Sequence, residues 1–389
     1  MDPSDLRVAL FSGNYNYIRD GANQALNRLV GYLLGRGVAV RVYSPTVRNP
    51  AFAPTGDLVS IPSLPVPGRS EYRAPLMIPP SVKEDIRRFD PTIFHIASPE
   101  ILGHRAVSLA HRMGVPVVAS VHTRFETYAR YYGMAFLEPI MVTMLRRLYN
   151  RCDAIFAPSQ SMARLLREER MNAHVHIWSR GIDRDIFSPE RSDPAWRRAL
   201  GIADDSPAVG FLGRLVMEKG LETFAEAVAA LRERGVRHEV IVIGDGPARE
   251  WFEKRLPEAH FVGFRRGEDL GRAVASMDVL LNPSVTETFG NVTLEALAAG
   301  VPVVAARATG SESLIEHGVT GMLVPPDATE EFADALQIYC RDDERRREAG
   351  KAGRRFSRKF GWDRVNQAML EGYIEILERA RDPPRRLTI

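Results

Sequence analysis

The sequence contains few cysteines and no long hydrophobic run. Only two cysteines occur in 389 residues, Cys152 and Cys340, and neither lies in a CxxC or Cys/His pattern. This excludes a disulfide framework and a zinc site of the usual spacing, and it favours a reducing, cytoplasmic location. Every apolar run is broken by glycine, proline or charge well short of a membrane span, and the first residues lack a basic stretch followed by an apolar core. We therefore expect a protein that is neither secreted nor transmembrane.

A strong excess of one charge is also missing. The 52 Lys and Arg side chains nearly balance the 49 Asp and Glu side chains, and the formal charge of +3 is carried mostly by arginine. No concentrated Lys/Arg tract occurs, so no nucleic-acid partner is expected. A hydrophobic content of 45% in a chain of 389 residues is typical of a globular protein with two domains.

Short segments rich in β-branched residues alternate with helix-like segments. Because apolar runs without alternation are typical of strands buried on both faces, we predict parallel sheets covered by helices. The first series of predicted strands comprises residues 7–12, 38–45, 92–97, 115–123, 154–159 and 174–181. The second series comprises residues 208–215, 238–246, 260–264, 279–284, 301–306 and 321–326. Between Pro45 and Pro80, frequent Pro, Gly and Ser predict an irregular surface region around one short strand, "LVSIPS".

The expected domains follow from the same pattern. The segment "RDIFSPERSDPAWRRALGIADDSPA" mixes prolines with charges and separates the two series of strands, as a linker does. Helical periodicity resumes at residues 363–380, and we expect this helix to return to the first domain. The predicted fold is α/β, with Rossmann-like domains over residues 1–187 and 188–358 and a C-terminal helical segment over residues 359–389.

The stretch "ETFGNVTLEALAAGVPVVAA" places two carboxylates, Glu287 and Glu295, ahead of a predicted strand. In one unbroken helix they would be separated by about 12 Å of rise and roughly 80° of rotation, so they could not grip one small group together. Gly290 disfavours such a helix, and Asn291 is a suitable N-cap. The two acids would then address two parts of an extended ligand, with the free amides of residues 289–291 near an anion. An exposed acid beside a helix-surface acid is about equally compatible with this spacing alone.

Three motifs taken together favour a ligand-binding role for the two acids. Glu287-x7-Glu295, "FLGRLVMEKG" and "GVPVVAARATGSESLIEHGVTGMLVPPD" resemble the retaining glycosyltransferases of family 4, which have the GT-B fold. The resemblance covers the second domain in order and the first domain more loosely. It implies two Rossmann-like domains with parallel sheets facing a central cleft. It also implies a nucleoside-diphosphate sugar of UDP or GDP as donor substrate, with no further cofactor and no metal ion.

The resemblance assigns roles by position in the motifs. Glu295 would bind the ribose hydroxyls, and Glu287 would orient and polarise the donor sugar. Arg214 and Lys219 would hold the diphosphate and stabilise it as it leaves. The other expected donor-site residues are Thr288, Phe289, Gly290 and Asn291.

A plainer interpretation of the two cations competes with this assignment. Considered alone, Arg214 and Lys219 are more simply solvated charges on a turn, with Lys219 paired to Glu218 or Glu222. Beside the two glutamates of the motif, that interpretation becomes the less favoured one.

Two patterns resemble metal sites only superficially. Asp183 and Asp185 have the spacing of a metal-binding DxD motif, but they lie in "RGIDRDIFSP" and no further acids converge on them. His174 and His176 share one face of a predicted strand without a third ligand, so we expect ordinary strand histidines.

The first domain offers residues for the acceptor side. His122 follows a predicted strand at the carboxyl edge of a sheet, and the resemblance places a histidine there in contact with donor sugar or phosphate. We assign it a polar contact, as a member of the catalytic site, rather than proton transfer. Gly13 and Gly21 in "FSGNYNYIRDGANQAL" allow a loop to approach substrate closely, although "DGAN" departs from the Gly-Gly pair of the family. The pattern is not GxGxxG, which disfavours dinucleotide redox chemistry.

The acceptor is less well defined by the sequence. Tyr128, Tyr131, Tyr132 and Phe136 predict either core packing, slightly favoured, or a surface for an amphiphilic acceptor or a membrane interface. "HTRFETYARYYG", "WSRGID" and "ETFGNVTLEA" resemble the branch of sulfoquinovosyl and related diacylglycerol glycosyltransferases.

We therefore expect retaining transfer of a hexose to a hydroxyl acceptor, with a membrane lipid and peripheral contact with the inner membrane face as candidates. The alternatives are an epimerase of the same fold, an α-mannosyltransferase acting on a soluble or polysaccharide acceptor, a nucleotide-sugar-binding partner protein, and a membrane-surface scaffold.

Overall fold

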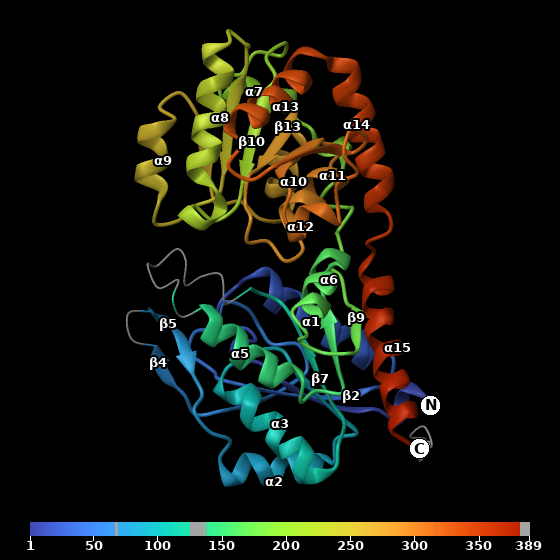
Figure 1. The fold of residues 1–389 in the computed structure, drawn as a ribbon. Coiled ribbons are helices and arrows are strands. Elements are labelled where there is room, and N and C mark those ends of the chain that lie inside the picture. Colours follow the sequence, from blue (N-terminus) through green and yellow to red (C-terminus); the bar gives the residue numbers. More distant parts are fainter. Residues whose placement is uncertain (67–68, 125–135, 137, 382–389) are drawn as a thin grey trace. The chain divides into compact units, whose positions relative to one another are not determined.

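The computed structural model describes residues 1–66, 69–124, 136 and 138–381. Its internal contacts divide the chain into two compact units. Unit 1 comprises Met1–Gly181 together with Trp362–Ile389, and unit 2 comprises Ile182–Gly361. Each unit contains a parallel sheet covered by helices (Figure 1).

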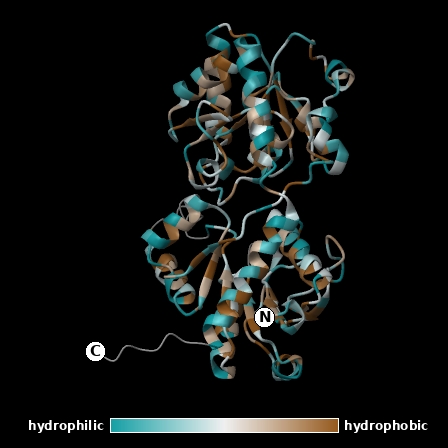
Figure 2. Ribbon diagram, turned by 90° about the vertical axis from the view of Figure 1, so that its right-hand side faces the viewer, coloured by the Kyte–Doolittle hydropathy of each residue, from teal (hydrophilic) through white to brown (hydrophobic). Residues whose placement is uncertain are grey.

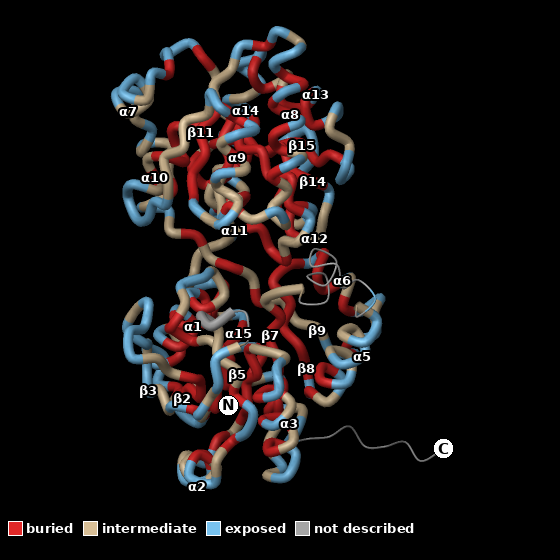
Figure 3. Tube along the Cα trace, turned by 90° about the vertical axis from the view of Figure 1, so that its left-hand side faces the viewer, coloured by how far each residue is buried: buried red, intermediate tan, exposed pale blue. Residues whose placement is uncertain are grey.

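The sheet of unit 1 has seven parallel strands in the order β3-β2-β1-β6-β7-β8-β9. Their bounds are β1 (Arg7–Phe11), β2 (Ala39–Ser44), β3 (Asp57–Ser60), β6 (Ile93–Ile96), β7 (Val117–Ser120), β8 (Ala154–Ala157) and β9 (Val175–Ile177). Strands β6, β7 and β8 are buried along their whole length and β1 is buried beyond Arg7, which explains the apolar sequences of these strands. Figure 3 shows these strands as the buried interior of the unit.

Helices cover both faces of this sheet. Helices α1 (Gly21–Gly35) and α15 (Trp362–Arg381) pack on one face, where Leu29 and Met369 belong to the same buried cluster. The other face carries α2 (Pro80–Phe89), α3 (Ile101–Met113), α5 (Glu138–Tyr149) and α6 (Gln160–Glu168). Helix α15 repeats apolar residues at the spacing of helical turns, and it packs against α1 and β9. The C-terminal helix thus completes the core of the N-terminal sheet.

One element of unit 1 differs from the sequence prediction. Strands β4 (Leu64–Val66) and β5 (Arg69–Ala74) form an antiparallel hairpin where only one short strand, now β3, was expected in an irregular region. Pro65 lies inside β4, and a proline in a run of residues argues against a strand unless the strand is short and lies at an edge. The two-stranded sheet meets that condition.

The sheet of unit 2 has six parallel strands in the order β12-β11-β10-β13-β14-β15. Their bounds are β10 (Ala208–Leu212), β11 (Glu239–Ile243), β12 (His260–Gly263), β13 (Val279–Asn282), β14 (Val303–Ala306) and β15 (Gly321–Val324). This is the doubly wound order of a Rossmann sheet, in which the direction of winding reverses between β10 and β13. The α/β prediction with two parallel sheets is confirmed.

Helices again cover both faces in unit 2. One face packs against α8 (Leu221–Glu233), α9 (Arg249–Arg255) and α13 (Thr329–Arg341), and the other against α10 (Gly267–Ala275) and α11 (Asn291–Ala298). The long helix α14 (Asp343–Ser357) packs on α11, and the short helices are α7 (Pro194–Ala199) and α12 (Thr309–Glu312). Figure 2 shows apolar residues concentrated on the strands and inner helix faces. No helix in the described ranges combines the length and apolarity needed to cross a bilayer.

Candidate active site

The carboxyl ends of β10, β13 and β14 bring three loops of unit 2 together. Strands β10 and β13 are neighbours at the point where the winding reverses, which is where ligands bind in open α/β sheets. The loop after β10 contains Arg214 and Lys219, and the loop after β13 contains Glu287. Thr286 and Ser284 of the second loop both donate to the Glu218 carbonyl oxygen of the first, at 3.3 and 3.5 Å. The sheet order therefore explains why these segments meet.

Lys219 and Glu287 form an ion pair in this site. Lys219 ends a 3₁₀ turn, Met217–Lys219, and its Nζ lies 2.5 Å from Glu287 Oε1. Gly220 caps the turn at φ 75°, and a Cβ there would lie 2.9 Å from the Pro283 ring. Only glycine combines that left-handed backbone with such a close approach. From the sequence, Lys219 was considered to pair with Glu218 or Glu222. In the structure it bonds instead to Glu287, which lies on another loop.

The backbone of Glu287 is held by the loop after β14. Thr309 Oγ1 donates to the Glu287 carbonyl oxygen at 2.8 Å. Gly310 packs against the same residue, because a Cβ at that position would lie 2.7 Å from the Glu287 Cβ. Three loops from three adjacent strands thus hold one carboxylate in place.

Helix α11 begins four residues after Glu287. Its N-cap is Gly290, at φ 94°, and Asn291 is its first residue, so the prediction of Asn291 as N-cap is wrong by one position. The left-handed backbone of Gly290, which glycine adopts without penalty, sets the start of the helix. Thr288 and Phe289 are buried, and the Phe289 ring packs on Phe360 at 5.8 Å between centroids. The side chain of Phe289 is therefore a core residue of unit 2.

Glu295 lies one turn into α11 and is partly buried. Burial of its carboxyl group, with a further contribution from the charge of Glu287, raises its pKa to about 8. Because the charge of Glu287 contributes to this shift, the two acids lie in the same part of unit 2. At neutral pH the free protein holds Glu295 largely protonated, as a hydrogen-bond donor and acceptor.

Arg214 directly follows Gly213 at the end of β10 and is exposed. Its side chain makes no hydrogen bond or ion pair within the described residues, whereas its carbonyl oxygen accepts from the Val216 amide at 3.0 Å. Leu215 in the same loop donates its amide to the Asp245 carbonyl after β11. Arg214 is thus a solvated guanidinium on a loop whose backbone is fixed.

His122 of unit 1 lies two residues beyond β7, in a chain of buried polar groups. Arg180 Nη2 lies 2.9 Å from His122 Nδ1, and because arginine can only donate, Nδ1 accepts. The ring proton is then on Nε2, which lies 2.8 Å from Ser120 Oγ. Burial, together with the charge of Arg180 and the proximity of His95, lowers the pKa of His122 well below its ordinary value. His122 is therefore neutral, with both ring nitrogens hydrogen-bonded.

The chain of polar groups continues to the C-terminal helix. Ser120 Oγ lies 2.7 Å from His95 Nε2 on β6, and His95 Nδ1 lies 2.6 Å from the Tyr373 hydroxyl on α15. Burial lowers the pKa of His95 to about 3. The sequence analysis missed His95, Arg180 and Tyr373, although Arg180 lies in the "WSRGID" motif that carries part of the resemblance.

Gly13 lies at the switch point of the first sheet. It follows β1, and a Cβ there would lie 2.4 Å from a carboxylate oxygen of Glu100, which follows the neighbouring strand β6. Burial of that carboxyl group raises the pKa of Glu100 to about 7. Gly21, in contrast, is the first residue of α1, capped by Asp20, which accepts from the Asn23 amide at 2.8 Å. Glu100 is an acid at a sheet edge that the sequence analysis did not identify.

The structure describes only some of the aromatic residues predicted for the acceptor, and it describes the histidines considered as metal ligands. Tyr128, Tyr131 and Tyr132 lie outside the described residues, whereas Phe136 is described and strongly exposed. In the described part of the chain, no three His, Cys, Asp or Glu side chains converge as metal ligands would. His176 instead stacks on Phe156 at 5.3 Å.

Comparison with known families matches both halves of the chain. Residues 19–186 match the family described as Glycosyltransferase Family 4, and residues 206–342 match the family described as Glycosyl transferases group 1.

Individual relatives extend over nearly the whole chain. The GDP-mannose-dependent alpha-mannosyltransferase of Mycolicibacterium smegmatis is 33% identical over 382 residues, covering 96% of this chain and 98% of that protein. The sulfoquinovosyl transferase SQD2 of Arabidopsis thaliana is 31% identical over 376 residues, covering 93% of this chain and 73% of that protein. The solved sucrose-phosphate synthase of Thermosynechococcus elongatus shares the fold, with a TM-score of 0.79 at 20% identity over 96% of this chain and 99% of that one.

Proposed function

The chain belongs to the glycosyltransferases of family 4, which have the GT-B fold and use nucleotide-sugar donors, and on that premise we propose that it transfers a hexose to a hydroxyl acceptor with retention of configuration. The relatives reported above carry transferase names, which gives no support to the epimerase alternative.

The ion pair between Lys219 and Glu287 beside Glu295 is the observation that carries this proposal. We assign the diphosphate to Lys219 and Arg214, the donor sugar to Glu287 and the ribose hydroxyls to Glu295. A diphosphate arriving at the first turn of α11 would attract the ammonium of Lys219, which bonds to the Glu287 carboxylate in the free protein. The amides of residues 288–291 at the start of this helix would supply further donors.

The reaction proposed here needs no group beyond the two substrates and these side chains. The bond between the anomeric carbon and the phosphate oxygen breaks, and the acceptor oxygen bonds to the same face of that carbon. The acceptor proton passes to the departing phosphate, whose developing charge Arg214 and Lys219 stabilise. Glu287 orients the sugar during this exchange.

Unit 1 would supply the acceptor side. We propose that Gly13 and Gly21 shape its loops and that His122 makes a polar contact rather than transferring a proton, because its ring is neutral and both nitrogens are bonded. Glu100, beside Gly13, is a further acid at the same sheet edge and a candidate to accept a hydrogen bond from the acceptor hydroxyl.

A membrane-bound acceptor is supported by the outer face of α5. Ile140 and Met144 lie four residues apart on α5 and are 57% and 55% exposed, and Phe136, two residues before the helix begins, is 73% exposed. Val142 and Leu145, on the opposite face, pack against the core of unit 1. An apolar stripe on an exposed helix face is typical of a surface that binds lipid or another apolar partner. We therefore propose a lipid acceptor and peripheral membrane contact.

An α-mannosyltransferase acting on a soluble or polysaccharide acceptor is the second candidate, and the name of the 33% identical relative, a GDP-mannose-dependent alpha-mannosyltransferase, supports its donor. The test is a thermal-shift panel of UDP-, GDP- and ADP-sugars, followed by transfer assays with the best donor on vesicle-borne and soluble acceptors. A donor that raises the melting temperature and is consumed only with acceptor present is the expected result. Consumption at the same rate without acceptor would contradict transferase activity.

A further inference from the structure

A cavity of about 370 Å³ lies in unit 2 where the chain enters and leaves that unit. One wall comes from residues 184–188, just after unit 2 begins at Ile182, and the other from residues 354–358, just before it ends at Gly361. These two chain segments are joined directly, because the Ile182 amide donates to the Phe360 carbonyl oxygen at 2.8 Å. None of the residues assigned above to the donor lines this cavity.

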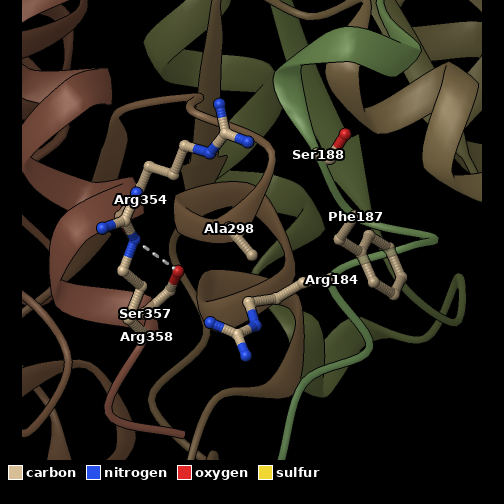
Figure 4. A pocket seen from close by; sticks show the side chains of 7 residues that line it. All are labelled: Arg184, Phe187, Ser188, Ala298, Arg354, Ser357 and Arg358. Carbon is tan, nitrogen blue, oxygen red and sulfur yellow. Dashed lines mark hydrogen bonds between the residues drawn. The ribbon is translucent and has the colours of Figure 1, made fainter. Parts of the chain in front are cut away.

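Three arginines line the cavity. In Figure 4, Arg354 and Arg358 extend from one side, on α14 and the residue that follows it, and Arg184 lies on the facing segment with Ala298 between them. Such a density of guanidinium groups around a small volume repels cations and attracts anions. Arginine also presents a planar fork that matches the oxygens of a phosphate group.

Only one of these three charges is balanced by a carboxylate in the described structure. Glu190 accepts two hydrogen bonds from Arg354, at 2.7 and 3.0 Å, and one from Ser188 at 2.6 Å. The bonds from Ser188 and Arg354 lower the pKa of Glu190 to about 2, so it stays ionised. Within the described residues, the side chains of Arg184 and Arg358 make no hydrogen bond or ion pair. Two guanidinium groups are thus available to a ligand.

The inner wall of the cavity is apolar and fixed. Phe187 and Ala298 are buried members of the core cluster beneath α11, and Ser357 is held by a bond from its Oγ to the Arg354 carbonyl oxygen at 2.8 Å. A volume of about 370 Å³ falls in the range of small-molecule sites, which combine apolar walls with a few polar groups. The fitting ligand is therefore a compact organic group that bears an anion.

We propose that this cavity is a second ligand site, which binds the phosphate group of a small phosphomonoester through Arg184 and Arg358 while its organic part rests on Phe187. The phosphomonoester could be a free metabolite or the head group of an anionic lipid, and both present the same terminal phosphate. This site is separate from the donor site and does not depend on the function proposed above.

The test measures binding of inorganic phosphate and glycerol 3-phosphate by calorimetry to the full chain and to Arg184→Gln and Arg358→Gln. The nucleotide that gives the largest thermal shift is present throughout, to occupy the proposed donor site. Each substitution should weaken phosphate binding about ten-fold, because a charge-assisted hydrogen bond is lost. Arg347→Gln is the matched control, since Arg347 is exposed on the same helix outside the cavity and should stay within about two-fold of wild type.

A parallel arm distinguishes the two sources of phosphate. Co-sedimentation with vesicles containing phosphatidic acid, compared with phosphatidylcholine alone, tests the lipid head group. The site is supported if wild type and Arg347→Gln bind in the calorimetry or the vesicle assay while Arg184→Gln and Arg358→Gln do not. The assay that shows this difference tells whether the phosphate comes from a free metabolite or from a lipid head group. No binding in either arm, or equal binding by wild type and both variants, would overturn it. The nucleotide-induced thermal shift in the same variants reports separately on the donor site and on folding.

Discussion

In the free protein the charges of Lys219 and Glu287 neutralise each other in an ion pair. In the proposed reaction the two acids of the motif, Glu287 and Glu295, have different roles. Glu287→Gln keeps the shape of the side chain but removes the charge that orients the sugar, so kcat should fall about a hundred-fold with little change in KM for the donor. Glu295→Ala removes hydrogen bonds made equally to bound donor and transition state, so KM for the donor should rise about ten-fold.

Steady-state kinetics at varied donor concentration separate these two effects. Glu250→Gln, at an exposed position of α9, is the control and should match wild type. Wild-type kinetics in both variants of the motif would refute the assignment.

The protonation of Glu295 gives a pH-dependent contribution to stability. Its pKa in the folded protein, about 8, lies above its ordinary value of 4.5. The folded state therefore binds the proton more tightly than the unfolded state, and folding stability falls as the pH rises from about 4.5 towards about 8. Glu295→Gln removes this titration. The melting temperature of the variant minus that of wild type should rise by a few degrees between pH 5 and pH 8, measured by calorimetry. A difference in melting temperature that does not change with pH would mean that the pKa of Glu295 is not raised in the folded protein.

At the scale of elements, the buried polar chain joins β6, β7 and α15. Tyr373→Phe removes the hydroxyl that bonds to His95 Nδ1, leaving a buried ring nitrogen without that partner. The free energy of unfolding should fall by about 1–2 kcal/mol, measured by urea denaturation. Donor binding should not change, because Lys219, Glu287 and Glu295 all belong to the other unit. A stability equal to wild type would mean that the hydroxyl has no net role.

The exposed face of α5 predicts a surface interaction. The double substitution Ile140→Gln and Met144→Gln leaves the inner face of the helix intact, so the protein should fold while binding to lipid vesicles weakens about ten-fold or more. Vesicle co-sedimentation measures this effect. Phe264→Gln, an exposed apolar residue of unit 2, is the matched control. Equal binding by all three proteins would remove the support for a membrane-bound acceptor.

At the scale of the whole molecule, the C-terminal helix belongs to the core of unit 1 although it follows unit 2 in the sequence. A chain that ends at Gly361 loses Met369, Tyr373 and Ile376 from a buried cluster that also holds α1 and the inner strands. Burial of three such side chains contributes several kcal/mol, so unit 1 should lose its cooperative unfolding transition.

Unit 2 retains every residue assigned to the donor in this shortened chain. Nucleotide binding, followed by calorimetry, should therefore persist while transfer to acceptor is lost. A chain ending at Arg381 is the control and should keep both activities. Loss of nucleotide binding together with transfer would place part of the donor site outside unit 2.

The amino-acid sequence by itself determined the strands of the two parallel sheets, the C-terminal helix and the pair of acids, because hydrophobic periodicity and short motifs are properties of neighbouring residues. Strands such as β1 and β13 lie inside their predicted segments, and the glutamate motif falls between β13 and β14 as the strand pattern indicates. Only the tertiary structure decided which distant groups meet. Lys219 bonds to a carboxylate 68 residues away rather than to Glu218, and the pKa of Glu295 depends on burial and on Glu287. Both depend on the order of strands in the sheet, which brings β10 and β13 side by side and which no local pattern contains.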